Sequence, residues 1–379
     1  MSAVRDYDKI LRREEKAVYD LRELYRSYGY ARFKMSKFEE YELYAHNKDF
    51  LVSDGILTFM NGDGKLMALK PDVTLSIVKN SADEPGLVQK MYYNENVYRI
   101  DRSTHEFREI MQTGVECIGD IAPYDVCEVI MLALDSLDMI SGGDYVLDIS
   151  HMAVAQGLVA ETDLPEDEKR AVLKCIAEKN AHGIAEICDR NGIPQRLTEK
   201  LTELVSIYGD MDKVLERLGK ISPEAGIESA VRELGEIRDL IKRRGLYEKV
   251  HFDFSILNDM GYYNGVVFQG FINGVPSGVL SGGRYDRLME KMGRKSGAVG
   301  FAVYLDALER LDDGQKQYDV DIVLLYGEND TAEDITAAVK SLAGEGYSVS
   351  AQKKVPQKLK FMKLCRLDGG EVKTIETNG

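Results

Sequence analysis

The distribution of strand-like segments constrains the fold of this chain more than any other sequence feature. These segments gather in two blocks, residues 30–119 and residues 250–272. Asn61-Gly62-Asp63-Gly64 in the first block and Asn273-Gly274 after the second are typical hairpin turns, and hairpins join antiparallel strands. Regular βαβ winding would instead alternate single strands with helices. The pattern therefore predicts an α+β fold built on an antiparallel sheet.

Helical segments are expected between and after the two blocks. Residues 152–247 are rich in Glu, Lys, Leu and Ala, which favours short helices inserted within one catalytic-type domain of residues 1–315. Helical periodicity in residues 123–140 predicts an amphipathic helix, and the apolar stretch Ala298–Leu311 predicts another. Residues 316–379 are typical of a small α/β domain that follows.

Charge and composition limit the classes of function. The formal net charge is −15 at pH 7, and so acidic a surface repels phosphate backbones, which makes tRNA a poor default partner. The five cysteines are scattered and indicate reduced thiols, and the histidines are scattered too, so we expect neither a metal site nor a cofactor. No segment reaches the roughly 20 apolar residues of a membrane span. We therefore expect a cytoplasmic protein that does not contact a membrane.

Asp72 and Thr74 form the first motif that can carry chemistry. An acid and a hydroxyl two residues apart, directly after a predicted strand, can bind an amine. The same pair is also typical of a helix N-terminus, and residues 74–80 are suited to a short helix. On the sequence alone, the role at a helix N-terminus is favoured.

Gln112 and Glu116 form the second motif. They lie an even number of residues apart, so on a strand they point to the same face. Two such groups among Val and Ile are costly to bury without partners, which indicates either a polar ligand pocket or a solvated sheet face. Arg99, Arg102 and Arg108, around the turn that precedes them, are suited to binding a phosphate or carboxylate.

Two further segments combine aromatic residues with glycines. On a strand, Tyr262 and Tyr263 would face opposite sides, so that one packs in the core while the other reaches a pocket, although both are equally suited to a core. Gly282-Gly283, followed by Arg-Tyr-Asp, lets the backbone approach a ligand closely. The segment Gly300-Phe301-Ala302 follows about fifteen residues later.

In this order and spacing, the segments resemble the histidyl-tRNA synthetase branch of the class II aminoacyl-tRNA synthetases, from about residue 5 to residue 310. The resemblance implies a class II antiparallel sheet flanked by helices, and a truncated anticodon-binding-like domain at residues 316–379. It also implies a histidine pocket formed by Asp72, Thr74, Gln112, Glu116, Tyr262 and Tyr263. Carboxylates suit an α-ammonium and an imidazole N–H, and the amide and hydroxyls complete a polar cup.

The chain departs from the active enzymes at two arginines. Where they carry Gly-Leu-Glu-Arg, this chain reads Tyr-Leu-Asp-Ala, so Ala307 replaces the arginine. Where they carry Arg-Gly-Leu-Asp-Tyr-Tyr, Asn258 stands in the first position, while Arg99 matches the arginine of the second motif. Losing one such donor costs roughly 3–4 kcal/mol of transition-state stabilisation, so adenylation is expected to be negligible.

A synthetase-like chain without these arginines resembles the regulatory subunit of ATP phosphoribosyltransferase. That resemblance implies a non-catalytic chain that binds and activates the short catalytic subunit in the first step of histidine biosynthesis, with feedback control by histidine. It also implies a homodimer within a larger hetero-oligomer. Two alternatives stay open at this point, an active histidyl-tRNA synthetase with unusual motifs and another amino-acid-binding paralogue of the synthetases.

Overall fold

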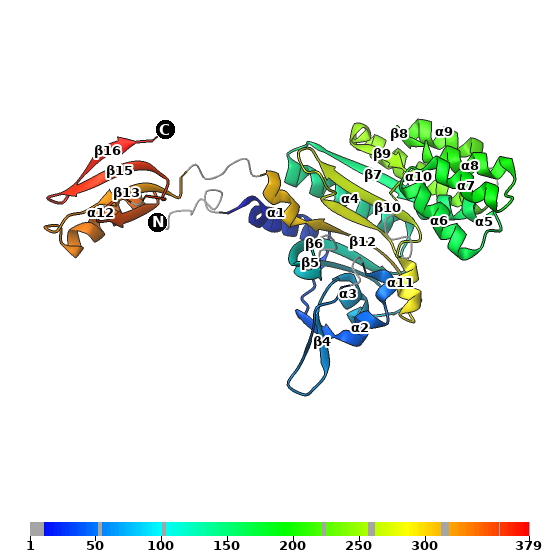
Figure 1. Cartoon of the computed structure of the whole chain (residues 1–379), viewed down its shortest axis with the longest axis horizontal. Helices are drawn as coiled ribbons and strands as arrows, with labels where there is room; N and C mark the ends of the chain where they lie inside the picture. The colour runs from blue at the N-terminus through cyan, green and yellow to red at the C-terminus, as the bar shows by residue number, and fades with distance from the viewer. Residues whose placement is uncertain are drawn as a thin grey trace. The chain divides into compact units, whose positions relative to one another are not determined.

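Strands from both predicted blocks combine in one large sheet. The computed structural model describes residues 11–51, 55–100, 104–221, 225–256, 262–311, 318–355 and 357–378. Within them, a nine-stranded sheet has the order β1-β5-β6-β12-β11-β10-β7-β9-β8 (Figure 1). In that order, its strands are Ala31–Arg32, Val88–Ile100, Phe107–Gly119, Gly297–Tyr304, Leu280–Arg284, Val266–Ile272, Tyr145–His151, Val250–Asp253 and Tyr208–Gly209. Most neighbours pair antiparallel, the exceptions being β1 with β5 and β7 with β9, which confirms the predicted α+β class.

Helices cover one face of this sheet. α1 (Arg13–Ser27) and α4 (Pro123–Ser141) place Leu21, Tyr25 and Val129 against the apolar residues of β6 and β12. α4 begins with a proline in its first turn and ends at Gly142, whose φ of 69° is the left-handed conformation that glycine adopts readily. The opposite face carries a second core beneath α3 (Thr74–Asn80) and α11 (Asp286–Lys291).

The helix predicted for Ala298–Leu311 is wrong. β12 occupies Gly297–Tyr304, and a 3-10 helix, η4 (Leu305–Leu311), follows it. β12 lies between β6 and β11 and is largely buried, and periodicity cannot distinguish an apolar run buried on both faces from a buried helix. The second predicted strand block begins at Val250 with β9 as expected, and β10 follows within it from Val266 to Ile272.

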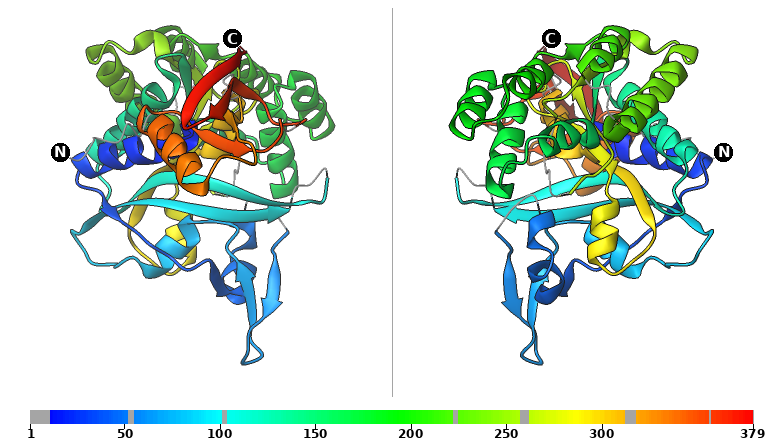
Figure 2. Two further views of the ribbon diagram at one scale, coloured as in Figure 1. Left: turned by 90° about the vertical axis from the view of Figure 1, so that its left-hand side faces the viewer. Right: turned by 90° about the vertical axis from the view of Figure 1, so that its right-hand side faces the viewer.

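A three-stranded sheet of order β2-β4-β3 projects from the large sheet. It comprises β2 (Phe38–Glu40), β4 (Leu66–Leu69) and β3 (Thr58–Met60), and it is followed in the chain by α3. The predicted turn at Asn61 is present, since the Asn61 side-chain carbonyl accepts hydrogen bonds from the backbone N–H groups of Asp63 and Lys65 at 3.0 and 2.8 Å. Figure 2 shows this hairpin extending away from the long strands β5 and β6. Short helices α2 (Tyr41–Ala45) and η2 (Lys48–Phe50) lie between β2 and β3 in the chain.

Helices also occupy the stretch between β7 and β9. They are α5 (Met152–Ala160), α6 (Glu166–Ala177), α7 (Ala181–Arg190), α8 (Gln195–Val205), α9 (Met211–Ile221), α10 (Ala225–Arg243) and η3 (Tyr247–Lys249). Pro165 and Pro194 immediately precede α6 and α8, where the missing N–H of proline costs no helical hydrogen bond. In α9 the buried residues Met211, Val214 and Leu218 follow helical spacing, so this helix buries one face and exposes the other.

The chain divides into two compact units, Met1–Leu311 and Asp312–Gly379. The second contains a four-stranded sheet of order β14-β13-β15-β16, with β13 parallel to both of its neighbours. Its elements are β13 (Val320–Leu325), α12 (Ala332–Gly344), β14 (Val349–Gln352), β15 (Phe361–Asp368) and β16 (Glu371–Thr377). Across the described part of the chain, every helix is too short or too polar to span a lipid bilayer.

Candidate functional site

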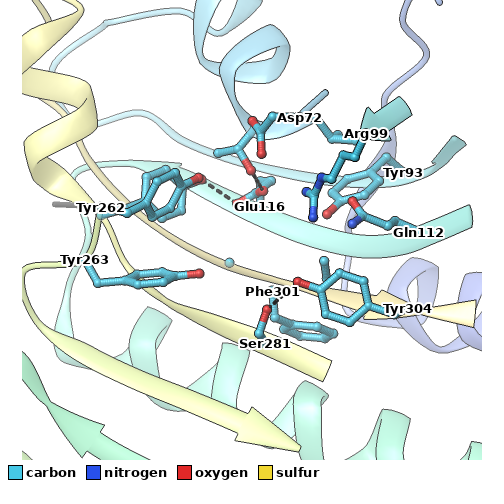
Figure 3. Close-up of a pocket in the computed structure, with 15 residues that line it drawn as sticks. Asp72, Tyr93, Arg99, Gln112, Glu116, Tyr262, Tyr263, Ser281, Phe301 and Tyr304 are labelled. Atoms are coloured by element: carbon cyan, nitrogen blue, oxygen red, sulfur yellow. Dashed lines mark hydrogen bonds between the residues drawn. The ribbon is translucent and has the colours of Figure 1, made fainter. Parts of the chain in front are cut away.

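A pocket opens on the sheet face opposite α1 and α4. Its walls come from β5, β6, β11, β12, the start of α3 and the segment before β10. It brings together predicted residues that are far apart in the sequence (Figure 3). The predicted histidine-pocket residues that line it are Asp72, Thr74, Gln112, Glu116, Tyr262 and Tyr263, and the predicted anion-binding residue Arg99 joins them.

The floor of the pocket is set by the register of β6 and β12. Gln112 and Glu116 lie on the same face of β6, as predicted from their even spacing. β12 pairs Gly300 with Glu116, Ala302 with Gly114 and Tyr304 with Gln112. Small residues therefore line the middle of the floor, with a carboxylate at one end and an amide at the other.

Glycines allow close packing around this floor. A Cβ at position 300 would lie 1.9 Å from a carboxylate oxygen of Glu116 and 2.4 Å from the backbone oxygen of Val115. A Cβ at Gly114 would lie 2.7 Å from the Tyr93 hydroxyl, and one at Gly283 would lie 2.7 Å from the ring of Tyr263. The paired glycines were expected to let the backbone approach a ligand closely. In the structure, neighbouring side chains and strands make the close approach to these glycines.

Glu116 is the buried charge-bearing group of the pocket. Its carboxylate accepts hydrogen bonds from the Thr74 hydroxyl at 2.8 Å and from the Tyr285 hydroxyl. Burial raises the pKa of Glu116 to about 8, and the nearby Asp72 carboxylate acts in the same direction, while the two hydroxyl donors oppose the shift. A carboxyl with this pKa exchanges its proton near neutral pH, so it can meet a ligand as an acid or as a carboxylate.

Asp72 and Thr74 lie at the N-terminus of α3. The Asp72 carboxylate accepts a hydrogen bond from the Leu75 backbone N–H at 2.9 Å, so the favoured role at a helix N-terminus is confirmed. Both residues also line the pocket, because α3 begins beside its mouth. The predicted position at a helix N-terminus and the predicted position in a pocket are therefore compatible.

Three tyrosines form the aromatic side of the pocket. The rings of Tyr262 and Tyr263 lie 4.8 Å apart, and Tyr262 lies 5.4 Å from the ring of Tyr285. The expectation that Tyr262 and Tyr263 face opposite sides of a strand is wrong, because both precede β10 and both line the pocket. Burial raises the pKa of Tyr262 and of Tyr285 well above the ordinary value, so these hydroxyls stay protonated at neutral pH.

Arg99 supplies a positive charge to the wall. Its Nε donates a hydrogen bond of 3.0 Å to the Pro71 carbonyl, which fixes the guanidinium on the wall of the pocket. Arg108 is half exposed, and its Nη2 lies 3.6 Å from the Asp306 carboxylate, outside the pocket lining. The predicted residue Arg102 lies outside the described residues. Across the described part of the chain, no group of three or more His, Cys, Asp or Glu is placed to hold a metal ion.

Comparison with known proteins identifies the family of this chain. The family model described as histidyl-tRNA synthetase matches residues 7–308. A protein of Syntrophotalea carbinolica named ATP phosphoribosyltransferase regulatory subunit is 31% identical over 294 residues, which cover 76% of this chain and 68% of the relative. The chain belongs to the family of ATP phosphoribosyltransferase regulatory subunits.

Solved structures place the fold of this regulatory-subunit family member among the class II synthetases. The histidyl-tRNA synthetase from Nostoc sp. superposes with a TM-score of 0.70 at 18% identity, over 96% of this chain and 93% of that chain. A chain of the ATP phosphoribosyl transferase (HisG:HisZ) complex from Thermotoga maritima superposes with a TM-score of 0.61 at 18% identity, over 76% and 96%. The predicted class II synthetase-like fold is thereby confirmed.

In this regulatory-subunit family member, the position that the synthetase motif gives to arginine is aliphatic. Ala307 lies in η4 and packs, partly buried, against the main core. Asn258, the other replaced position, lies outside the described residues. Among the described residues that line the pocket, the acidic side chains are Asp72 and Glu116 and the basic side chain is Arg99.

Part of the pocket wall of this family member consists of residues that were not predicted to lie there. Tyr93, Ser281, Tyr285 and Tyr304 all line it. Tyr285 belongs to the Gly-Gly-Arg-Tyr-Asp segment, so that motif already pointed to it. Tyr93 and Tyr304 follow only from register, because pairing places Tyr93 beside Gly114 and Tyr304 beside Gln112.

Proposed function

We propose that this chain is the non-catalytic regulatory subunit that binds and activates a short catalytic subunit of ATP phosphoribosyltransferase, and that its pocket binds histidine as the feedback ligand. Family membership supports the regulatory role. A relative of the same fold occurs in a structure named as a complex of the two kinds of subunit. The observation that carries the ligand is the buried Glu116 carboxyl, held by Thr74 and Tyr285 at one end of a polar pocket.

The pocket groups match the polar groups of histidine one by one. Glu116 is suited to accept an imidazole N–H, and the neighbouring hydroxyl of Tyr262 or Tyr263 to meet the other ring nitrogen. The Asp72 carboxylate and the Gln112 amide oxygen suit the α-ammonium group. Arg99 suits the carboxylate. In this assignment, each polar group of a free histidine molecule meets a pocket group of complementary charge or hydrogen-bonding type.

The same groups argue against a second role as a tRNA ligase. Adenylation develops negative charge on the phosphates of ATP, and that charge needs fixed cations. In the described part of the pocket wall, Arg99 is the cationic side chain, and Ala307 is neutral. We therefore expect no histidine-dependent ATP–pyrophosphate exchange, and a clear exchange signal would replace this proposal with the synthetase alternative.

Reconstitution tests the regulatory role. The full chain is mixed with a short ATP phosphoribosyltransferase catalytic chain, and phosphoribosyl transfer is measured with each chain alone and with the mixture. We expect a gain in activity and co-elution on size exclusion, with light scattering reporting a homodimer of this chain within a hetero-oligomer. A mixture without complex and without gain would refute the regulatory role.

Calorimetry tests the ligand independently of the partner. Histidine is titrated into the full chain, and the Glu116→Gln variant is compared with Glu109→Gln. Glu109 serves as a matched control because it lies on the same strand, β6, but is exposed and outside the pocket lining. We expect Glu116→Gln to weaken binding at least about tenfold and Glu109→Gln to match the parent chain. Equal affinity in all three proteins would refute the pocket assignment.

A further inference from the structure

The far end of the pocket floor is closed by two hydroxyl-bearing side chains. Tyr304 is the last residue of β12, and its hydroxyl shares a hydrogen bond of 2.7 Å with the hydroxyl of Ser281 on β11. Both residues line the pocket. In Figure 3, Tyr304 lies on the same side as Gln112, away from Tyr262 and Tyr263, and Ser281 lies between Tyr263 and Tyr304.

Along β12, Tyr304 is the first large side chain on the floor. Gly300 and Ala302 precede it on the same face, where they pair with Glu116 and Gly114 of β6. Tyr304 lies four positions after Gly300 along the strand, a distance of about 13 Å between backbone positions. A free amino acid anchored at Glu116 therefore meets an open floor first, and then the ring of Tyr304 beside Gln112.

The hydrogen bond fixes this ring as part of the wall. Ser281 pairs with Ala302 in the sheet, so its hydroxyl rises from the floor one strand away from Tyr304. The bond joins two neighbouring strands and holds the ring on the side of the pocket where Gln112 lies. A ligand that extends beyond the small floor residues must displace the ring and break this bond.

We infer that the Tyr304–Ser281 pair is the specificity wall of the pocket, which admits an amino acid with a free carboxylate and excludes one whose carboxylate carries a bulky group such as a nucleoside. This inference rests on the proposed function, because it takes the amino acid to bind with its side chain at Glu116 and its carboxylate toward Arg99. It adds a second barrier to adenylate binding, which is steric and independent of the missing arginines.

Two probes measure the wall. The full chain is titrated with histidine and with the stable sulfamoyl adenosine analogue of histidyl adenylate, which keeps a negative charge and adds the nucleoside. The readout is the ratio of the two dissociation constants in the parent chain, Tyr304→Ala, Tyr304→Phe and Ser281→Ala. We expect the parent to prefer histidine by at least about a hundredfold, and Tyr304→Ala to reduce that ratio at least about tenfold.

The conservative variants separate the ring from its hydroxyl. Tyr304→Phe keeps the ring and is expected to retain most of the preference, whereas Ser281→Ala frees the ring and is expected to give an intermediate ratio. Circular dichroism verifies that each variant is folded, and Tyr304→Phe remains informative if the alanine variant is not. A parent chain that binds both probes within threefold, or a ratio that Tyr304→Ala leaves unchanged, would overturn the inference while histidine binding stands. A parent chain that binds no histidine would instead overturn the proposed function, and the inference with it.

Discussion

Proton exchange at Glu116 gives the sharpest test of the ligand assignment. The pKa of about 8 means that roughly one in eleven of these carboxyls is ionised at pH 7 when the pocket is empty. A ligand that donates an N–H to Glu116 binds the ionised form, so binding must release the proton. Each unit between the pH and this pKa costs about 1.4 kcal/mol of binding free energy.

The magnitude follows from the ionised fraction. That fraction rises from about one in eleven at pH 7 to about one half at pH 8, so the affinity for histidine should increase about fivefold over this interval. Close to one proton per ligand should be released at pH 7. Titration calorimetry in two buffers of different ionisation enthalpy measures that number directly, because the apparent heat then differs by the proton count times the difference in buffer enthalpy.

A variant isolates the contribution of Glu116 from that of the ligand. Glu116→Gln keeps the shape of the side chain but cannot ionise, so any proton exchanged by the ligand itself is measured in this variant and subtracted. Glu109→Gln, on the exposed part of β6, should release protons as the parent chain does. Histidine binding that releases no proton in the parent chain, with affinity flat from pH 7 to pH 8, would refute the reasoning, since Glu116 would then stay protonated in the complex.

Three further outcomes are expected. Burial raises the pKa of Glu116 from the ordinary 4.5 to about 8, so the parent chain loses stability as the pH rises between these values. The melting temperature of Glu116→Gln, measured relative to that of the parent, should therefore be higher at pH 8.5 than at pH 4. An equal difference in melting temperature at both pH values would contradict this. Gly300→Ala should lower the melting temperature and abolish binding, because its Cβ overlaps Glu116 and the β6 backbone, whereas Gly219→Ala, in open space on α9, should be neutral or stabilise by up to about 1 kcal/mol. Arg99→Ala should weaken histidine more than histidinol, which has no carboxylate, and an equal loss for both in calorimetry would remove Arg99 from the carboxylate site.

Much of the site follows from sequence because local periodicity carries it. The even spacing of Gln112 and Glu116 was enough to place both on one face of β6. The hairpin at Asn61 and the helix N-terminus at Asp72 follow from the preference of these side chains to accept hydrogen bonds from backbone N–H groups a few residues later. These features can be predicted without knowing which other segments lie next to them in the tertiary structure.

The rest depended on which strands are neighbours. β12 looked helical because it is apolar on both faces, and only its position between β6 and β11 explains that pattern. The register of β12 with β6 places Tyr304 opposite Gln112 and Gly300 opposite Glu116. A larger residue than glycine at position 300 would overlap the Glu116 carboxylate. Neither segment by itself predicts the pairing of strands almost two hundred residues apart. The position of Tyr304 in the pocket wall therefore follows only from the three-dimensional structure.

The burial of Glu116 is itself an argument for a ligand. A buried carboxyl with a raised pKa destabilises the chain near neutral pH, whereas an apolar or amide side chain of similar size would not. A site that served only the core would not need the acid. A Glu116→Gln chain that is more stable than the parent near neutral pH but binds histidine at least about tenfold more weakly would account for this acid, because the stability that it costs the empty chain would be offset when the ligand occupies the pocket.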